Sequence, residues 1–256
     1  MTRRILTAVV GIPIVLAALF GPPILAEIFI AIIGIGMAYE YLALISRFNE
    51  IHLAAMIGFQ ILLIALAALL PLQTFALIIG VLILLALAAH FIGGLPRWNT
   101  MGVLYVTVPL ALLVSVRLLD QGIEWLIVVL AATWATDTMA LFGGKAFGKT
   151  KLAPAISPNK TREGTAIGIG AGALAVLIAG WATGLLDHHA VVMVFLAILL
   201  PPLAVIGDLV ESKVKRVYGK KDSGTILPGH GGLLDRLDSL LFTVSALWLI
   251  VVLFAQ

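Results

Sequence analysis

Long apolar runs fill most of this sequence, and they restrict the chain to a small set of folds. A helix needs about 20 apolar residues to cross the hydrocarbon core of a bilayer, and nine nearly uncharged segments approach that length. Only 11% of the residues are charged, whereas about 25% are charged in a typical soluble domain. The sequence therefore predicts an all-α polytopic integral membrane protein. The expected helices span 5–20, 24–45, 51–70, 74–92, 101–117, 122–143, 164–184, 191–208 and 238–255.

The first apolar segment has the charge pattern of a signal peptide, because Arg3 and Arg4 precede it. However, Gly21-Pro22-Pro23 is a poor cleavage site and a second apolar segment follows at once, so we interpret the first segment as a retained helix. The chain has no Cys, which excludes disulfides and thiolate metal sites.

The placement of Lys and Arg predicts the orientation of the helices. If the N-terminus lies in the cytoplasm and nine helices alternate, 15 of the 16 basic residues fall on the cytoplasmic side and only Arg117 falls outside. Cytoplasmic loops carry an excess of Lys and Arg. The division therefore supports nine crossings, with a cytoplasmic N-terminus and an external C-terminus.

Two of the expected cytoplasmic loops are long, 144–163 and 209–237. Loops of more than about 12–15 residues tend to be functional or disordered. Because these two contain Gly, Pro, His and paired acids, we expect them to be functional. We divide the chain into N-terminal transmembrane helices, 1–117, and a C-terminal transmembrane catalytic region, 118–256, which carries both loops.

The segment that enters the second loop reads IGDLVESKVKR. Its polar residues Asp208, Ser212, Lys215 and Arg216 have the i, i+4, i+7, i+8 spacing of one helix face. An interfacial helix end that contacts anionic lipids would show the same pattern, so that alternative stays open. Upstream, Pro201-Pro202 should kink or break the helix.

The second loop itself, KKDSGTILPGHGGLLDRLD, is charged and rich in glycine. Glycines let the backbone approach a ligand closely, and backbone N–H groups in such turns can bind anions. His230 is either structural or catalytic. Asp235 and Asp238 begin the last helix, where acids also serve as caps. Carboxylate oxygens are the ligands that Mg²⁺ prefers, so Asp208 and Asp235 predict a metal site if the last two helices pack side by side.

The first loop is basic, and acids lie inside the helices near it. An acid within a membrane span is costly and is a functional hypothesis by default. We expect Asp137, in WATDT, and Glu40, in AYEYL, to pair with basic residues. Gly164, Gly168 and Gly172 are four apart, which is typical of close helix packing and not of a nucleotide-binding loop. The basic residues of the loop are Lys145, Lys149, Lys151, Lys160 and Arg162.

At this point the sequence resembles a known family. SKVKRVYGKKDSGTILPGHGGLLDRLD, Ser212 to Asp238, closely resembles the signature of the phosphatidate cytidylyltransferases, also called CDP-diacylglycerol synthases. The signature reads S-x-apolar-K-R, four residues, K-D, x, small, then P-x-H-G-G and D-R-x-D, and every defined position is met. Trp134 to Gly164 is also similar to the family, whereas the N-terminal half matches only as generic hydrophobic helices. The matching residues of the signature are Ser212, Lys215, Arg216, Lys221, Asp222, Gly224, Pro228, His230, Gly231, Gly232, Asp235, Arg236 and Asp238.

The resemblance implies a membrane enzyme that transfers the cytidylyl group of CTP to phosphatidic acid, giving CDP-diacylglycerol and pyrophosphate. It implies Mg²⁺, with K⁺ as a second cation, and a homodimer. We expect a bacterial cytoplasmic (inner) membrane, an active site that faces the cytoplasm, and no nucleic acid partner. The metal-binding acids of the family map onto Asp208 and Asp235. The expected catalytic residues are Asp208, Asp235, Asp238, Lys221 and His230. The expected substrate-binding residues are Ser212, Lys215, Arg216, Asp222, Gly231, Gly232, Arg236, Lys160 and Asp137.

The charges agree with this chemistry. CTP brings about four negative charges and phosphatidic acid one or two, and transfer between phosphates depends mainly on positioning and charge neutralisation. We expect the basic residues of the second loop to clamp the phosphates. Two alternatives stay open. A CTP-dependent lipid-alcohol kinase would release CDP instead of pyrophosphate, and a transporter would carry its polar residues near the membrane midplane.

Overall fold

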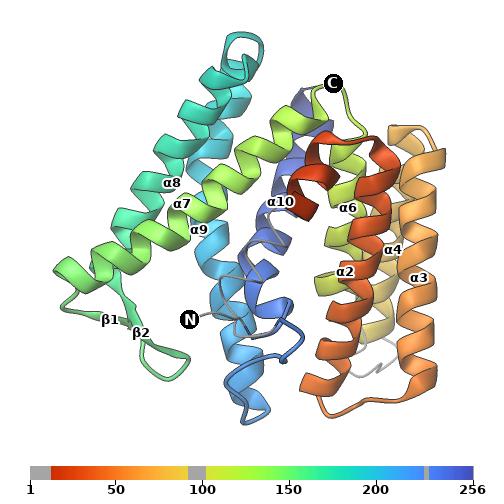
Figure 1. The fold of residues 1–256 in the computed structure, drawn as a ribbon, viewed down its shortest axis with the longest axis horizontal. Coiled ribbons are helices and arrows are strands. Elements are labelled where there is room, and N and C mark those ends of the chain that lie inside the picture. The colour runs from red at the N-terminus through yellow and green to blue at the C-terminus, as the bar shows by residue number, and fades with distance from the viewer. Residues whose placement is uncertain (1–12, 92–101, 228–230, 256) are drawn as a thin grey trace. The chain divides into compact units, whose positions relative to one another are not determined.

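The computed structural model describes residues 13–91, 102–227 and 231–255. The chain divides into two compact units. One is formed by Met1–Leu119 and Asp222–Asp235, and the other by Asp120–Lys221 and Arg236–Gln256. Within the described residues both units are helical, apart from one short hairpin in the second unit (Figure 1). The division at residue 117 stays a prediction.

Helices α2, α3 and α6 of the first unit pack against one another and run side by side in Figure 1. Each contributes a side chain that is fully buried: Met37, Leu63 and Val114. Asn49 begins α3, because its side chain accepts a hydrogen bond from the backbone N–H of Ile51 at 2.8 Å. The elements of this unit are α2 (Pro23–Leu44), α3 (Glu50–Leu69), α4 (Leu72–Phe91), the π-helix η1 (Val103–Thr107) and α6 (Val108–Arg117).

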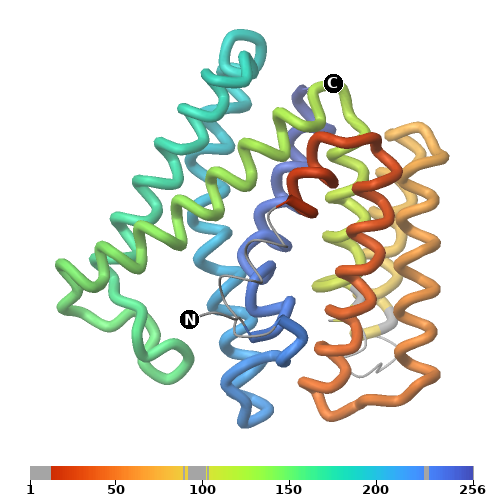
Figure 2. The backbone as a smooth tube through the Cα atoms, in the orientation of Figure 1, coloured from red at the N-terminus to blue at the C-terminus, as the bar shows by residue number. Residues whose placement is uncertain are grey.

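The second unit is built around the contact between α7 and α8, which lie side by side in Figures 1 and 2. Glycines make this contact close. A Cβ on Gly168 would lie 2.6 Å from the carbonyl oxygen of Thr136, and one on Gly164 would lie 2.6 Å from that of Ala140. The prediction that these glycines serve helix packing is confirmed. The elements of this unit are α7 (Gly122–Phe147), β1 (Lys151–Ala153), β2 (Ser157–Thr161), α8 (Arg162–Ala182), α9 (Leu185–Val217) and α10 (Leu234–Phe254), whose first two residues belong to the first unit.

The first long loop was expected over 144–163, and this range is wrong in part. Helix α7 continues to Phe147, and strands β1 and β2 pair antiparallel to form a hairpin, visible between the ends of α7 and α8 in Figure 2. The carboxylate of Glu163 accepts hydrogen bonds from the backbone N–H groups of Lys149 and Thr150, at 3.0 and 3.1 Å. The hairpin is therefore closed at its base by an acid on the first turn of α8.

The second long loop, expected over 209–237, is also shorter than predicted. The membrane span was expected to end at residue 208, with a helix face that extends to Arg216; helix α9 has 33 residues in all and ends at Val217. From residue 190 to residue 217 the helix is uninterrupted, and at 1.5 Å per residue this part is about 42 Å long, more than the roughly 30 Å core of a bilayer. The helix is not broken at Pro201-Pro202, because the non-helical dihedral angles inside α9 fall at His189; a kink at the two prolines stays a prediction. The polar end of the membrane helix is therefore continuous with its apolar part.

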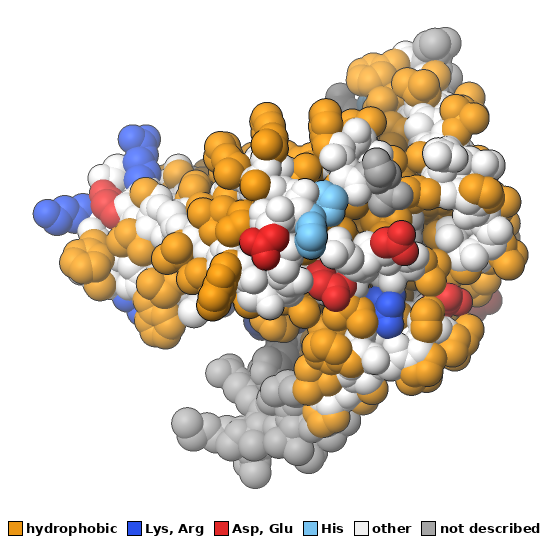
Figure 3. Space-filling view, turned by 90° about the horizontal axis from the view of Figure 1, so that it is seen from above, with side chains coloured by type: hydrophobic (Ala, Val, Ile, Leu, Met, Phe, Trp, Pro, Cys, Tyr) orange, Lys and Arg blue, Asp and Glu red, His pale blue; other side chains and the backbone are white. Residues whose placement is uncertain are grey.

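Six helices among the described residues are long and apolar enough to cross a membrane: α2, α3, α7, α8, α9 and α10. Two shorter apolar helices span Leu72–Ala88 and Leu104–Arg117. Hydrophobic side chains cover most of the face in Figure 3, and large ones such as Trp181 and Ile198 are exposed, as suits a surface in contact with lipid. An all-α membrane protein is thus confirmed. The count of nine crossings and the orientation stay predictions, and the expected helix 5–20 lies mostly outside the described residues.

Candidate active site

Asp208 lies at the centre of a polar group in the second unit. The Nζ atom of Lys160, on β2, is 2.5 Å from Oδ2 of Asp208, and both side chains are partly exposed, at 22% and 28%. One turn along α9, the hydroxyl of Ser212 donates a hydrogen bond to Oδ1 of Asp208 at 3.2 Å. The structure therefore brings together three of the predicted site residues, and it confirms that Asp208 and Ser212 share a helix face.

Two further acids interact with Asp208. Asp137, on α7, lies near enough to Asp208 and Lys160 to interact electrostatically with both, and it accepts a hydrogen bond from the hydroxyl of Ser239 at 3.5 Å; a direct pair with a basic residue stays a prediction. Asp238, on α10, is 8% exposed and interacts with Asp208, Asp137 and Lys215. Three carboxylates from three helices thus lie near one another, with Lys160 paired to one of them. We call Asp137, Lys160, Asp208 and Asp238 the acidic cluster.

Close packing of α9 and α10 places Asp238 beside Asp208 within the second unit. A Cβ on Gly207 would lie 2.7 Å from the carbonyl oxygen of Asp238 and 3.1 Å from Cα of Ser239. Ser239 donates its backbone N–H to Oδ1 of Asp238 at 2.7 Å. The last two helices therefore approach each other closely at Gly207, whereas a metal site shared by Asp208 and Asp235 stays a prediction.

Two predicted phosphate ligands on α9 make contacts within the protein. Lys215 forms an ion pair with Glu211, which is 1% exposed. Arg216 donates from Nε to the carbonyl oxygen of Ile156 at 3.2 Å, and from Nη1 to that of Lys220 at 3.3 Å. Arg216 therefore holds the tip of the hairpin against the end of α9. Sequence reasoning missed Glu211, although its i, i+4 spacing to Lys215 is a signal for this pair.

In the first unit, Asp235 organises the glycine-rich loop. Its carboxylate accepts hydrogen bonds from the backbone N–H of Ser223, at 3.1 and 3.2 Å to the two oxygens, and from that of Gly232 at 3.0 Å. The backbone N–H of Leu227 donates to the carbonyl oxygen of Gly231 at 3.0 Å. Gly231 has a φ of +86°, which favours glycine over other residues. Asp235 thus joins the beginning and the end of the loop.

The other predicted residues of this region are placed as follows. Lys221, Asp222 and Arg236 are exposed. His230, together with Pro228 and Gly229, lies outside the described residues, so its role stays a prediction.

Glu40 reaches the same loop from α2. It is 1% exposed, and its Oε2 atom accepts hydrogen bonds from the backbone N–H of Leu234 and from the hydroxyl of Ser223. The expected basic partner is therefore replaced by a backbone amide and a hydroxyl. The sequence indicated that Glu40 is an acid within a membrane span, but it did not indicate that Leu234 and Ser223 are its partners.

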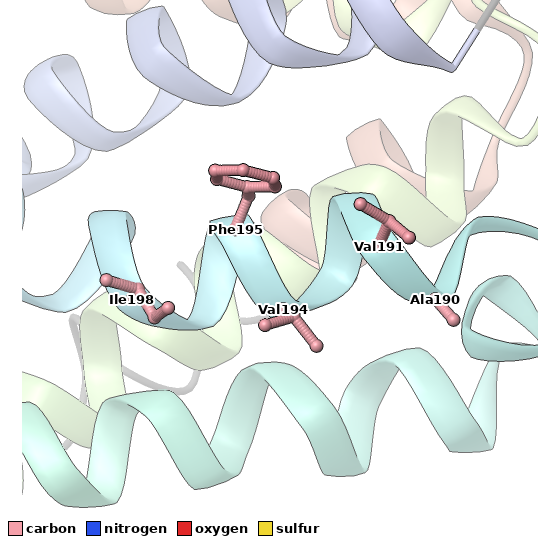
Figure 4. Close-up of a pocket in the computed structure, with 5 residues that line it drawn as sticks. All are labelled: Ala190, Val191, Val194, Phe195 and Ile198. Carbon is pink, nitrogen blue, oxygen red and sulfur yellow. The ribbon is translucent and has the colours of Figure 1, made fainter.

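Two features of the described residues bear on metal and ligand binding. No group of three or more His, Cys, Asp or Glu side chains among them is arranged to hold a metal ion. The pairing of Asp208 with Asp235 as metal ligands stays a prediction. A pocket on α9 is lined by Ala190, Val191, Val194, Phe195 and Ile198 (Figure 4). All five side chains are apolar, so this pocket offers no side-chain group to a triphosphate.

Comparisons with known proteins cover the whole chain. A family model described as the cytidylyltransferase family matches residues 2–254. The phosphatidate cytidylyltransferase of Brucella abortus biovar 1 (strain 9-941) is 35% identical over 270 residues, which cover 100% of this chain and 95% of that protein. The phosphatidate cytidylyltransferase of Bacillus subtilis (strain 168) is 41% identical over 61% of this chain and 58% of its own length. That of Helicobacter pylori is 49% identical over 47% of this chain and 43% of its own.

Proposed function

This chain belongs to the cytidylyltransferase family, and we propose that it transfers the cytidylyl group of CTP to phosphatidic acid, releasing CDP-diacylglycerol and pyrophosphate. The observation that carries this proposal is the acidic cluster. In this cluster, Asp208 of α9 forms an ion pair with Lys160 of the hairpin, and it also accepts a hydrogen bond from Ser212. A lysine and carboxylates at the end of an apolar helix suit a reaction between a soluble nucleotide and a lipid headgroup.

The reaction needs no covalent enzyme intermediate. An oxygen of the phosphatidate headgroup attacks the α-phosphorus of CTP and forms the new P–O bond. The bond between the α-phosphorus and the bridging oxygen breaks, and pyrophosphate leaves with the electron pair. Since both reactants are anions, the protein acts mainly by holding them in line and offsetting their charge.

Lys160 is the cation best placed to do this in the second unit. Its ammonium group is partly exposed and is held by Asp208, so it can contact a phosphate without leaving its position on the hairpin. The hydroxyl of Ser212 can in turn donate to a phosphate oxygen. Arg216 acts indirectly. It donates hydrogen bonds to the carbonyl oxygens of Ile156 and Lys220, and the bond to Ile156 fixes the hairpin that carries Lys160.

Asp208 offers carboxylate oxygens, the ligands that Mg²⁺ prefers. Among the described residues, Asp137, Asp208 and Asp238 are not grouped to hold a metal ion by themselves, so Asp208 would hold it together with oxygens of the substrates. When bound, the cation supplies positive charge to the phosphates. Asp208 is the acid that we propose to hold it. Its pairing with Asp235, and K⁺ as a second cation, stay predictions.

The membrane arrangement proposed here follows from the distribution of charge. Nine crossings, with a cytoplasmic N-terminus and an external C-terminus, put all but one of the 16 basic residues in the cytoplasm, where CTP is found. The relatives are bacterial proteins, and this favours the inner membrane of a bacterium. A homodimer remains part of the proposal from the family resemblance.

Pyrophosphate release by the full-length protein in detergent tests the proposed function. With CTP, phosphatidic acid and Mg²⁺, we expect pyrophosphate that depends on the lipid, and a loss of about 100-fold or more in Asp208→Asn. Glu27→Gln is the matched control, because Glu27 lies on α2 away from the cluster residues in sequence and has no assigned role. Release of CDP with a lipid alcohol would indicate a kinase instead. No turnover with either acceptor, in protein shown to be folded, would reject both and direct attention to transport.

A further inference from the structure

Glu40 joins the two ends of the glycine-rich loop, which here means the described residues 222–227 and 231–234. Its Oε2 atom accepts a hydrogen bond from the backbone N–H of Leu234 at 3.0 Å and another from the hydroxyl of Ser223 at 3.4 Å. Ser223 lies at the beginning of the loop and Leu234 at its end. One buried oxygen of α2 therefore holds together two points that are 11 residues apart in the chain.

Two glycines of the loop leave room for this carboxylate. A Cβ on Gly224 would lie 2.7 Å from Cγ of Glu40, and a Cβ on Gly232 would lie 2.7 Å from its Oε2 atom. Real Cβ atoms do not come so close to other heavy atoms. The sequence predicted that glycines here let the backbone approach a ligand. At these two positions the close approach is made by a side chain of the protein itself.

Helix α2 also makes an apolar contact with the loop, at Gly36. Gly36 lies one turn before Glu40 on α2, and a Cβ on Gly36 would lie 2.5 Å from Cδ1 of Leu233 and 3.5 Å from Cδ1 of Ile226. Leu233 and Ile226 both belong to the loop. Helix α2 therefore presents a small residue and an acid, four positions apart, to the same segment.

Glu40 also acts on the start of α10. Leu234 is the first residue of that helix, and the first N–H groups of a helix have no partner within it. A negative charge at a helix N-terminus is favourable, so Glu40 caps α10 from another helix. Asp235 is the next residue, and it binds the backbone N–H of Ser223 while Glu40 binds the hydroxyl of that serine. The two acids thus hold the same serine by different groups.

We infer that Glu40 is a positioning residue for this enzyme, which fixes the glycine-rich loop and the carboxylate of Asp235 by holding Ser223 and the N-terminus of α10. The inference rests on the proposed function for its effect on catalysis. The contacts of Glu40 on which it depends all lie within the first unit. Glu40 does not touch the reactants in this scheme, so its loss acts through the loop. We expect a fall in kcat together with a rise in the KM for CTP.

Three variants of the full-length protein test the inference. Glu40→Ala removes both hydrogen bonds, Glu40→Gln keeps an acceptor but loses the charge, and Gly224→Ala crowds the carboxylate from the loop side. Hydrogen exchange of the amides in 222–234 is measured beside kcat and KM. We expect exchange in the loop to rise at least about 10-fold in Glu40→Ala, with kcat/KM about 100-fold lower. Glu40→Gln should recover part of both, because a neutral acceptor makes a weaker bond than a charged one.

Matched controls separate a local role from a general loss of stability. Glu27→Gln changes an acid on the same helix, and Gly170→Ala adds a Cβ where no atom lies within 4 Å; both should behave as wild type. Faster exchange throughout α2, α3 and α6 in Glu40→Ala would overturn the inference, as would faster exchange in the loop with unchanged kcat and KM. A wild-type protein that lacks turnover would reject the proposed function, whereas the exchange measurement would still test the anchoring of the loop.

Discussion

Lys160 holds Asp208 through an ion pair with 2.5 Å between Nζ and Oδ2. The lysine comes from the hairpin and the acid from the far end of α9, so the pair ties two segments of the second unit together at the proposed site. It also means that the acid proposed to hold a metal ion already has a cation beside it. Lys160 and a divalent cation therefore compete for one carboxylate, unless the lysine moves to a phosphate.

The first prediction concerns this competition. In Lys160→Gln, we expect kcat/KM to fall by about 100-fold, because one cation that offsets charge in the transition state is lost. The Mg²⁺ concentration that gives half of the maximal activity should decrease, because Asp208 no longer has an ammonium group beside it. A Mg²⁺ titration of pyrophosphate release measures both quantities.

Lys213→Gln is the control for that experiment, since Lys213 is an exposed lysine on α9. An unchanged Mg²⁺ requirement in Lys160→Gln, with lower activity, would show that Lys160 serves the substrates alone.

The second prediction concerns metal removal. A chelator should abolish turnover, and Mg²⁺ should restore it, because both reactants are polyanions whose charge a bound cation offsets. In Asp208→Asn, high Mg²⁺ should restore little activity. Full activity of the wild type in the presence of a chelator would contradict the proposed role of the acidic cluster.

The third prediction concerns Arg216 and the hairpin. Arg216→Lys keeps the charge but cannot reproduce hydrogen bonds to both Ile156 and Lys220, so hydrogen exchange in 151–161 should increase several-fold. Activity should fall by about 10-fold, because Lys160 is then less well positioned. If Arg216 instead binds phosphate through its charge alone, Arg216→Lys would keep near wild-type exchange and activity.

The fourth prediction concerns helix packing. Gly168→Ala places a Cβ 2.6 Å from the carbonyl oxygen of Thr136 and 2.7 Å from Cβ of Ala140, and we expect a loss of about 1–3 kcal/mol in the free energy of unfolding. Gly170→Ala, on the solvent or lipid side of the same helix, should cost nothing. Thermal unfolding of the two variants in detergent distinguishes them. Equal melting temperatures of the two variants would show that the close contact of Gly168 with α7 does not contribute to stability.

Several features could be predicted because they depend on spacing along one helix. Asp208 and Ser212 are four apart, and their hydrogen bond is the expected result. Gly164, Gly168 and Gly172 are also four apart along one helix, and their close packing was predicted from that spacing. On α9, the spacing of the polar residues predicted a helix face that extends to Arg216, whereas the loop range 209–237 was set by the fall in hydropathy after residue 208 and was too long. Polar residues there continue the helix to Val217.

Contacts between distant segments could not be predicted from spacing. Glu40 and Leu234 are 194 positions apart, and nothing in AYEYL indicates that a backbone amide is its partner. A basic partner was the reasonable expectation for an acid in a membrane span, but hydrogen bonds from an amide and a hydroxyl also satisfy a buried carboxylate. Similarly, the basic residues of the first loop gave no sign that β1 and β2 would pair.

The length of α9 has a consequence for how the enzyme meets its lipid. Beyond His189 a single unbroken helix passes from apolar residues such as Leu196 to Asp208 and Arg216. A helix of fixed rise per residue sets the height of Asp208 above the middle of the bilayer. The headgroup plane, by contrast, moves outward as acyl chains lengthen. Bilayer thickness thereby becomes a variable of catalysis, and turnover should be greatest in the membrane whose phosphate plane coincides with the level of Asp208.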